Sequence, residues 1–372
     1  MTHNDRHPDK TRVEIHAKDY HKKRRILGWV LGILTAGVLA VAIYSAYIYY
    51  QTKNAVDNTY DRHNQVQIKN DEFNGKNEFA VLLMGTDTGA LDRKEKVGNT
   101  DTMIIATVNP RKKRYTLMSV PRDTMAEMVG AEKFQIEKIN AAYPLGGAKM
   151  AMSSVSQLVN IPIKYYALVN MKGIMRLIRD VDGLDIKPTL SFEYGGYIFK
   201  KGQLTHMGGG GALAYSRMRY DDPEGDYGRQ KRQRQIITAL IQKSLSLNTL
   251  PKLDSVLEAI SGNVKTNLPF KALEAIAFNY RSSTKHVKND YLHGHSAMVD
   301  DAAYQIQSTK ELQRVSDYLR QELGLPQETV NNNETQQNKL NQQQGFKFSD
   351  AEAQNYHIYR NSSQQLIEKD DN

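Results

Sequence analysis

An unbroken run of uncharged residues extends from Ile26 to Tyr50, and most of its side chains are apolar. About twenty apolar residues are enough to cross the hydrocarbon core of a bilayer as an α-helix. Tyr44, Tyr47, Tyr49 and Tyr50 gather at the far end of the run, as in an interfacial aromatic belt. The pattern predicts a transmembrane helix over residues 26–50.

The residues before this run are basic. Residues 1–25 hold eight Lys and Arg against four Asp and Glu, which gives a net charge of +4. Because positive flanks stay in the cytoplasm, we expect residues 1–25 to be a cytoplasmic tail and residues 51–372 to be extracellular. A cleaved signal peptide is the alternative, but the apolar run is too long for one and no small-residue cleavage site follows it.

The outer part divides into three segments by composition. Residues 51–75 are polar and predict a juxtamembrane linker. Residues 326–372 are rich in Gln and Asn and lack apolar periodicity, so we expect a disordered tail. The folded domain is therefore expected over residues 76–325.

Within this domain, short apolar runs alternate with helical patterns. The run Phe79–Met84 is continuous, as in a strand buried on both faces. Interleaving of this kind favours an α/β fold, a mixed central β-sheet flanked by helices (an α-β-α sandwich), preceded by the transmembrane helix. Strands are expected over residues 79–84, 102–108, 115–120, 164–170 and 184–188, and helices over residues 147–159, 171–179, 210–218, 228–247, 251–261, 270–281 and 308–323.

Composition narrows the chemistry. The chain has 372 residues, a formal charge of +9 and no cysteine. Without cysteine, disulfide frameworks, thiolate nucleophiles and Cys-ligated zinc are excluded. The positive charge indicates an anionic partner: a nucleic acid, an anionic lipid or a phosphate-rich polymer.

Two aspartates stand at the edges of expected strands. Asp87 follows the first strand and Asp101 precedes the second. If these strands are neighbours, the two carboxylates approach each other, and their repulsion is relieved by a cation or a proton. Oxygen ligands of this kind suit Mg²⁺. Aspartates at strand ends are also common turn-formers, which is the alternative interpretation.

Basic residues form two further clusters. Arg122 follows the third expected strand, and Lys138 comes shortly after it. In the segment 216–235, Arg229, Gln233 and the apolar Ile236 and Leu240 share one helix face.

Because the apolar end of this face must be buried, Arg229 and Gln233 should point inward, with Arg232 flanking them. Cations at a helix N-terminus are unfavourable unless an anion is bound, and Arg offers bidentate donors to phosphate. The alternatives are a solvated charged loop or a nucleic-acid surface, although the acidic residues mixed into this segment oppose the latter.

Five segments, in this order, resemble the LytR–CpsA–Psr family: Leu82–Asp87, Thr100–Met103, Val120–Thr124, Lys138–Asn140 and Arg217–Gln235. One departure is Asn99, where many relatives carry arginine. The resemblance implies a phosphotransferase that moves an anionic glycopolymer, such as wall teichoic acid or capsule, from an undecaprenyl-pyrophosphate carrier in the membrane to peptidoglycan, forming a phosphodiester. No nucleic-acid partner is implied.

By motif position, the resemblance implies that Asp87 and Asp101 hold Mg²⁺ or Mn²⁺. It also implies a pyrophosphate site and a catalytic set. The implied pyrophosphate-binding residues are Arg122, Lys138, Arg217, Arg219, Arg229, Arg232 and Gln233, and the implied catalytic residues are Asp87, Asp101, Arg122, Arg217 and Arg219. Two other functions stay open: a non-catalytic scaffold that binds the lipid carrier, and a membrane-bound transcriptional attenuator.

Overall fold

The continuous apolar run near residue 80 forms β1 (Phe79–Thr86), a central strand buried on both faces. The computed structural model describes residues 47, 50, 60–61, 64, 66–69, 71–86, 98–244, 264–350, 352–360 and 365–366. Apart from Tyr47 and Tyr50, all of them belong to one unit, Ala55–Asn372. The expected helix at 251–261 lies outside the described residues.

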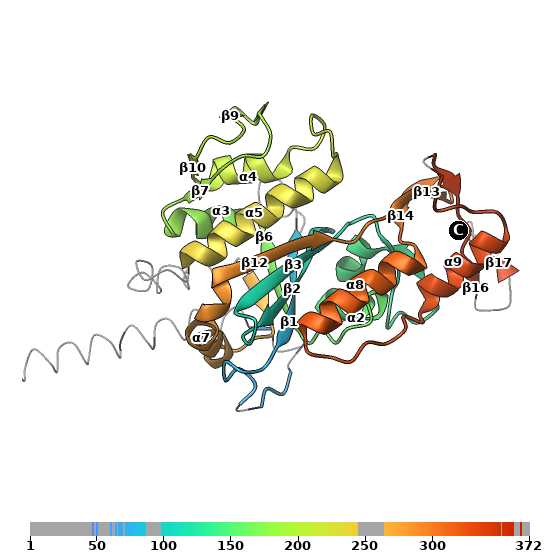
Figure 1. The fold of residues 1–372 in the computed structure, drawn as a ribbon, viewed down its shortest axis with the longest axis horizontal. Coiled ribbons are helices and arrows are strands. Elements are labelled where there is room, and N and C mark those ends of the chain that lie inside the picture. The colour runs from blue at the N-terminus through green and yellow to red at the C-terminus, as the bar shows by residue number, and fades with distance from the viewer. Residues whose placement is uncertain are drawn as a thin grey trace, which may run out of the picture. The chain divides into compact units, whose positions relative to one another are not determined.

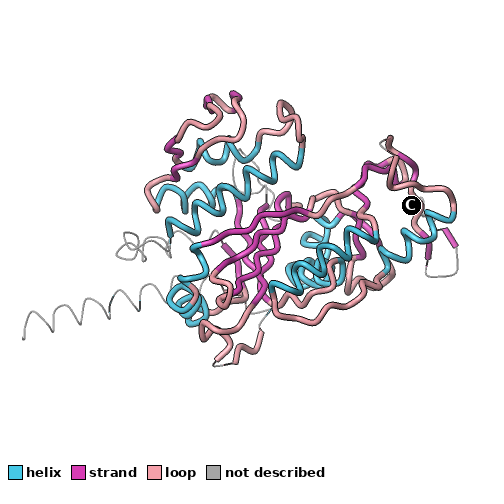
Figure 2. Tube along the Cα trace, viewed as in Figure 1, coloured by secondary structure: helices cyan, strands magenta, loops and turns pink. Residues whose placement is uncertain are grey.

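Strand β1 belongs to a mixed six-stranded sheet (Figures 1 and 2) with the order β11-β6-β1-β2-β3-β12. Strand β1 runs antiparallel to β2 and parallel to β6, and β3 runs antiparallel to β2 and parallel to β12. The C-terminal ends of β1, β3 and β6 therefore share one edge of the sheet with the start of β2. The partner strands are β2 (Thr100–Asn109), β3 (Arg114–Val120), β6 (Tyr165–Asn170), β11 (Val264–Thr266) and β12 (His286–Tyr291).

Successive side chains of a strand point to opposite faces, and helices cover both faces of this sheet. Leu82 and Met84 of β1 pack in one core cluster with α2 (Ala142–Leu158) and α8 (Thr309–Glu322). On the other face, sheet residues pack against α5 (Asp226–Ser244) and α7 (Phe270–Asn279). The predicted sheet between helical layers is confirmed.

A smaller lobe carries α3 (Met171–Asp180) and α4 (Gly209–Arg217), which pack together with α5 around Tyr215. Two short strand pairs complete it. They are β7 (Leu184–Ile186) with β10 (Thr205–Met207), and the hairpin β8 (Phe192–Tyr194) with β9 (Tyr197–Phe199).

The polypeptide after β12 adds a second, small sheet of β13 (His295–Val299), β14 (Ala302–Ile306) and β15 (Gln354–Asn355). The pair β4 (Met125–Glu127) and β5 (Ile136–Lys138) follows the end of β3. The remaining elements are the 3₁₀ turns η2 (Ile139–Ala141) and η4 (Arg281–Lys285) and the pair β16 (Tyr359–Arg360) and β17 (Gln365–Leu366).

The disordered tail expected from residue 326 is not what the structure shows for its described part. Residues Asn333–Gln343 form α9, which begins with a capping box at Asn332. Its amide side chains bond to extended backbone: Gln337 both donates to and accepts from Tyr359, and Asn341 does the same with His357. Amide-rich composition indicates disorder only when the amides are solvated. Here the amide side chains form the backbone hydrogen bonds that a neighbouring strand would otherwise form.

The folded domain also begins earlier than residue 76. Phe73, which falls in the expected linker, is 5% exposed and packs edge-on against Phe79 with ring centroids 5.1 Å apart. Most of the predicted membrane helix lies outside the described residues. Within the described part of the chain, no helix combines the length and the apolarity that a membrane span needs.

Glu334 in α9 provides a test of the C-terminal packing. The residue is 2% exposed, and one carboxyl oxygen accepts a 2.8 Å hydrogen bond from the Glu127 N–H. Burial raises the pKa of Glu334 from 4.5 to about 7. The folded state therefore binds more protons than the unfolded state between these two pH values.

We predict that the free energy of unfolding falls as pH rises from about 4.5 to 7, by on the order of 3 kcal/mol, and then levels off. Glu334→Gln keeps an acceptor oxygen and should flatten this part of the profile. Denaturant unfolding at a series of pH values measures the effect. An equal slope in wild type and Glu334→Gln would contradict the assignment.

Candidate functional site

A cavity of about 550 Å³ opens between the sheet and the helices α3, α4 and α5. This is within the usual size range of small-molecule sites. Its walls are largely aliphatic and come from strands, from all three helices and from α7. The aliphatic residues and methionines that line it are Leu83, Met84, Ala167, Val169, Met171, Ile174, Leu177, Leu213, Ile236, Ile237, Leu240, Ile241, Val264, Leu268 and Leu273.

Polar side chains line the cavity at the sheet edge where β1, β3 and β6 end and β2 begins. Asp101 lies in β2, and Arg122 comes two residues after β3. Six of the nine residues proposed from sequence line this polar end of the cavity: Asp101, Arg122, Arg217, Arg219, Arg229 and Gln233. The structure thus brings together side chains from four separate segments around one space.

Arg122 is held by two carboxylates. Its guanidinium donates a 2.9 Å hydrogen bond to Asp101 and lies 3.6 Å from Asp123. Burial alone would lower the pKa of Arg122, but the hydrogen bond and the nearby negative charges outweigh burial and raise it. Arg122 therefore stays charged at the polar end of the cavity.

Arg229 is the most buried cation of this group, with 8% of its surface exposed. Asp226 lies 2.7 Å from its guanidinium, one helical turn earlier. Burial lowers the pKa of Arg229, and the neighbouring charges of Arg122 and Arg219 lower it further. The charges of Arg122 and Arg219 thus oppose that of Arg229, which leaves the polar end of the cavity favourable for an anion.

The inward direction of Arg229 and Gln233 has a local cause. They share a face of α5 with Ile236 and Leu240, and all four residues line the cavity. The helical repeat that buries the apolar residues also turns the two polar ones inward.

Arg232 does not line the cavity, and the structure assigns it a different role from the predicted one. Its side chain is fully buried, donates to the Tyr215 carbonyl at 2.9 Å and pairs with Asp222. It also donates to the Met218 carbonyl. Arg232 therefore fixes the loop that carries Arg219 and has no free face for a phosphate.

Lys138 also lies away from the cavity lining. Its ammonium is 3.4 Å from Asp123 and 5.3 Å from the centroid of the Tyr304 ring. Asp87 lies outside the described residues, although the preceding Thr86 lines the cavity. Within the described ranges, no cluster of three or more His, Asp or Glu side chains could hold a metal.

Several cavity residues were not anticipated from sequence. Asn170 caps α3 by accepting a 2.8 Å hydrogen bond from the Gly173 N–H, which places it directly at the end of β6. An Asn three residues before Gly at a strand-to-helix boundary is the signal that could have identified it. Tyr194 and Tyr220 also line the cavity, and no sequence spacing predicts them.

An aliphatic cavity that ends in clustered arginines is a site for an amphiphile with an anionic head group. Comparisons agree with this class: residues 43–321 match the LytR_cpsA_psr family. The chain belongs to this family, as its motifs indicate.

Two curated relatives are polyisoprenyl-teichoic acid–peptidoglycan teichoic acid transferases. The one from Enterococcus faecalis is 41% identical over 81% of this chain and 98% of its own length. The one from Bacillus subtilis is 33% identical over 81% of this chain and 97% of its own length. A crystal structure from Enterococcus faecalis, described as a transcriptional regulator, is 36% identical with a TM-score of 0.61, covering 69% of this chain and 91% of that one.

Arg232 has a structural role, whereas other arginines of this segment line the cavity. Measurements of stability can test the structural role. Removing one partner of a buried ion pair leaves an uncompensated charge, so we predict that Arg232→Met lowers the free energy of unfolding by about 3–5 kcal/mol. Lys231→Met is the matched control, because Lys231 is exposed and 3.7 Å from Glu224. It should change stability by less than about 1 kcal/mol. Thermal or denaturant unfolding gives both values, and equal losses would refute the structural role of Arg232.

Proposed function

We propose that this protein transfers an anionic glycopolymer from a polyprenyl-pyrophosphate lipid to peptidoglycan. The names of its relatives state, for them, the transfer of teichoic acid from polyisoprenyl-teichoic acid to peptidoglycan. The observation that carries the proposal is the joining of an aliphatic cavity to Arg122, Arg217, Arg219 and Arg229. The cavity suits a polyprenyl chain, and the guanidiniums suit a pyrophosphate. A DNA-binding surface would instead present exposed cations to solvent.

In the proposed reaction, a hydroxyl oxygen of peptidoglycan attacks the phosphorus that bears the glycopolymer. A phosphodiester forms, the bond to the second phosphate breaks, and the polyprenyl phosphate leaves. Phosphoryl transfer depends mainly on positioning and on charge stabilisation. The guanidiniums would stabilise negative charge as it develops on the leaving phosphate.

A carboxylate is needed to take the proton of the attacking hydroxyl, and Asp101 is the described carboxylate on the cavity. Asp87 remains the second candidate from sequence. One or two carboxylates together with substrate phosphate oxygens are the usual ligands of Mg²⁺. We propose that Asp101 and Asp87 hold this ion, which would neutralise phosphate charge.

We also propose a location: one membrane helix over residues 26–50, an inner N-terminus and an outer catalytic domain. The basic residues 1–25 and the uncharged run support it. A pyrophosphate-linked donor is also suited to the cell exterior, which lacks nucleoside triphosphates, because the donor arrives already activated. Protease added to intact cells should then cleave the domain, and full protection in intact cells would contradict this orientation.

Arg219→Ala tests the charge-stabilising role. We predict a loss of about 10²–10³ in transfer rate, because one oriented charge contact to the transition state is removed. The full-length chain in detergent would be assayed with a synthetic polyprenyl-pyrophosphate glycan and purified peptidoglycan. Arg111→Ala is the control, since this side chain is 73% exposed and pairs with Glu78 away from the cavity. Equal activity of the two variants would count against the site.

Asp101→Asn separates an enzyme from a lipid-binding scaffold. The change keeps the shape but removes the charge, so we predict a 10²-fold or greater loss of rate if Asp101 is the base, and a higher Mg²⁺ requirement. Asp185→Asn is the control, because Asp185 is 58% exposed, lies 2.8 Å from His206 and does not line the cavity, so this variant should lose far less. If Asp101→Asn changed only donor affinity, the scaffold function would be favoured.

A further inference from the structure

The polar end of the cavity depends on two segments that are far apart in sequence. Arg122 follows β3, whereas Arg229 lies in the first turn of α5. The two guanidiniums repel each other, as the effect of Arg122 on the pKa of Arg229 shows. Asp101 and Asp226 each hold one of the two guanidiniums, and contacts outside the cavity hold the segments that carry them.

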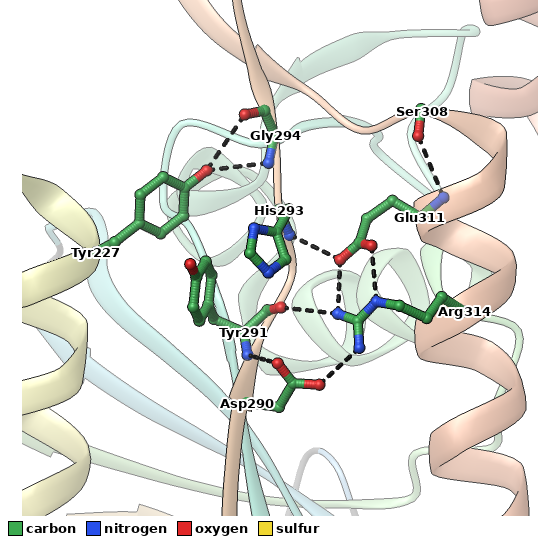
Figure 3. A network of polar contacts seen from close by, with 8 residues as sticks. All are labelled: Tyr227, Asp290, Tyr291, His293, Gly294, Ser308, Glu311 and Arg314. Carbon is green, nitrogen blue, oxygen red and sulfur yellow. Dashed lines mark hydrogen bonds and ion pairs between the residues drawn. The ribbon is translucent and has the colours of Figure 1, made fainter. Parts of the chain in front are cut away.

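Tyr227 attaches the start of α5 to the strand pair β13–β14. Its hydroxyl accepts a 2.9 Å hydrogen bond from the Gly294 N–H (Figure 3) and lies 3.2 Å from the Gln305 Oε1. Its ring packs against Tyr291, with centroids 4.7 Å apart. Tyr227 precedes Arg229 by two residues, so this attachment sets the position of the first helical turn.

Gln305 in β14 reaches the other segment. Its backbone N–H donates a 2.8 Å hydrogen bond to the carbonyl of Asp123, the residue directly after Arg122. A parallel bridge also joins Thr124 to Gln305, and Gln307 Nε2 donates to the Thr124 hydroxyl at 3.1 Å. One residue, Gln305, thus contacts both arginine-bearing segments.

The stretch that receives Tyr227 is itself anchored. The His293 N–H donates a 2.9 Å hydrogen bond to Glu311 at the start of α8. Arg314, one turn later, bonds to Glu311 and Asp290 and to the Tyr291 carbonyl (Figure 3). Helix α8 packs into the hydrophobic core that it shares with α2 and the sheet. The segment 290–294 therefore has a rigid support.

From these contacts we infer that Tyr227 and Gln305 are positioning residues, which hold Arg122 and Arg229 at the spacing that a pyrophosphate requires. The inference rests on the proposed function. Neither residue lines the cavity, so neither is catalytic. Their effect on the reaction passes through the two guanidiniums, for which a displacement of about 1 Å can cost about 10²-fold in rate.

The test removes the shared contact from either side. Tyr227→Phe deletes only the hydroxyl, and Gln305→Leu deletes the side-chain acceptor. Each should lower kcat for transfer about 10-fold or more in the full-length chain, at a temperature well below unfolding. Gln305→Glu retains an acceptor oxygen and should recover most of the rate. The double variant Tyr227→Phe/Gln305→Leu should lose less than the product of the two single losses.

Tyr280→Phe is the matched control. Its hydroxyl donates a 2.9 Å hydrogen bond to the Asn77 carbonyl, and the residue is 2% exposed. It lies outside the cavity and does not contact Tyr227 or Gln305. It should lower stability without lowering kcat. If Tyr227→Phe lowered stability alone and kept the wild-type kcat, the inference would be overturned. If the wild-type chain transferred no glycan at all, the proposed function itself would fail, which is a different result.

Discussion

The clustering of arginines at one end of an aliphatic cavity is the arrangement on which the rest of the site depends. The charges of Arg122 and Arg219 repel that of Arg229 and lower its pKa. Three local carboxylates, Asp101, Asp123 and Asp226, offset part of this repulsion. The positive charge that remains attracts an anion. The aliphatic walls behind the arginines favour an anion that carries a long apolar group.

The sheet topology explains why these residues meet. Because β1, β3 and β6 point the same way and β2 runs opposite, three strand ends and one strand start share an edge. Asp101 in β2 and Arg122 after β3 lie at that edge, while Arg217, Arg219 and Arg229 are supplied by α4, α5 and the loop between them. Apolar residues of the strands form one wall of the cavity. The same sheet thus contributes to both halves of an amphiphile site.

Sequence periodicity was sufficient for part of this site. It placed Arg229 and Gln233 on the cavity because Ile236 and Leu240 dictate which face of α5 is buried. Periodicity places Arg232 only beside this face, and it does not predict the partners Tyr215 and Asp222, which come from the adjoining helix and loop. Helical periodicity predicts the direction of a side chain, but it does not predict the hydrogen-bond acceptors that other segments supply.

Composition misjudged the C-terminal segment for a similar reason. The composition predicts disorder for the segment that holds Gln337 and Asn341, but each of these residues forms paired hydrogen bonds with a backbone N–H and carbonyl. Amide side chains satisfy both a carbonyl and an N–H, so they can fold a segment that has few apolar residues. Strand-like pairing between a helix and a loop leaves no periodic signature in sequence.

Helix α5 shows how little freedom such a site has. Tyr227 faces β13–β14, Arg229 faces the cavity, Arg232 faces α4, and Ile237 packs on the sheet. A rotation that improved any one of these contacts would break the other three. The helix is therefore fixed from four directions. Clustered cations repel one another, so without these contacts they would move apart and the preorganised charge would be lost.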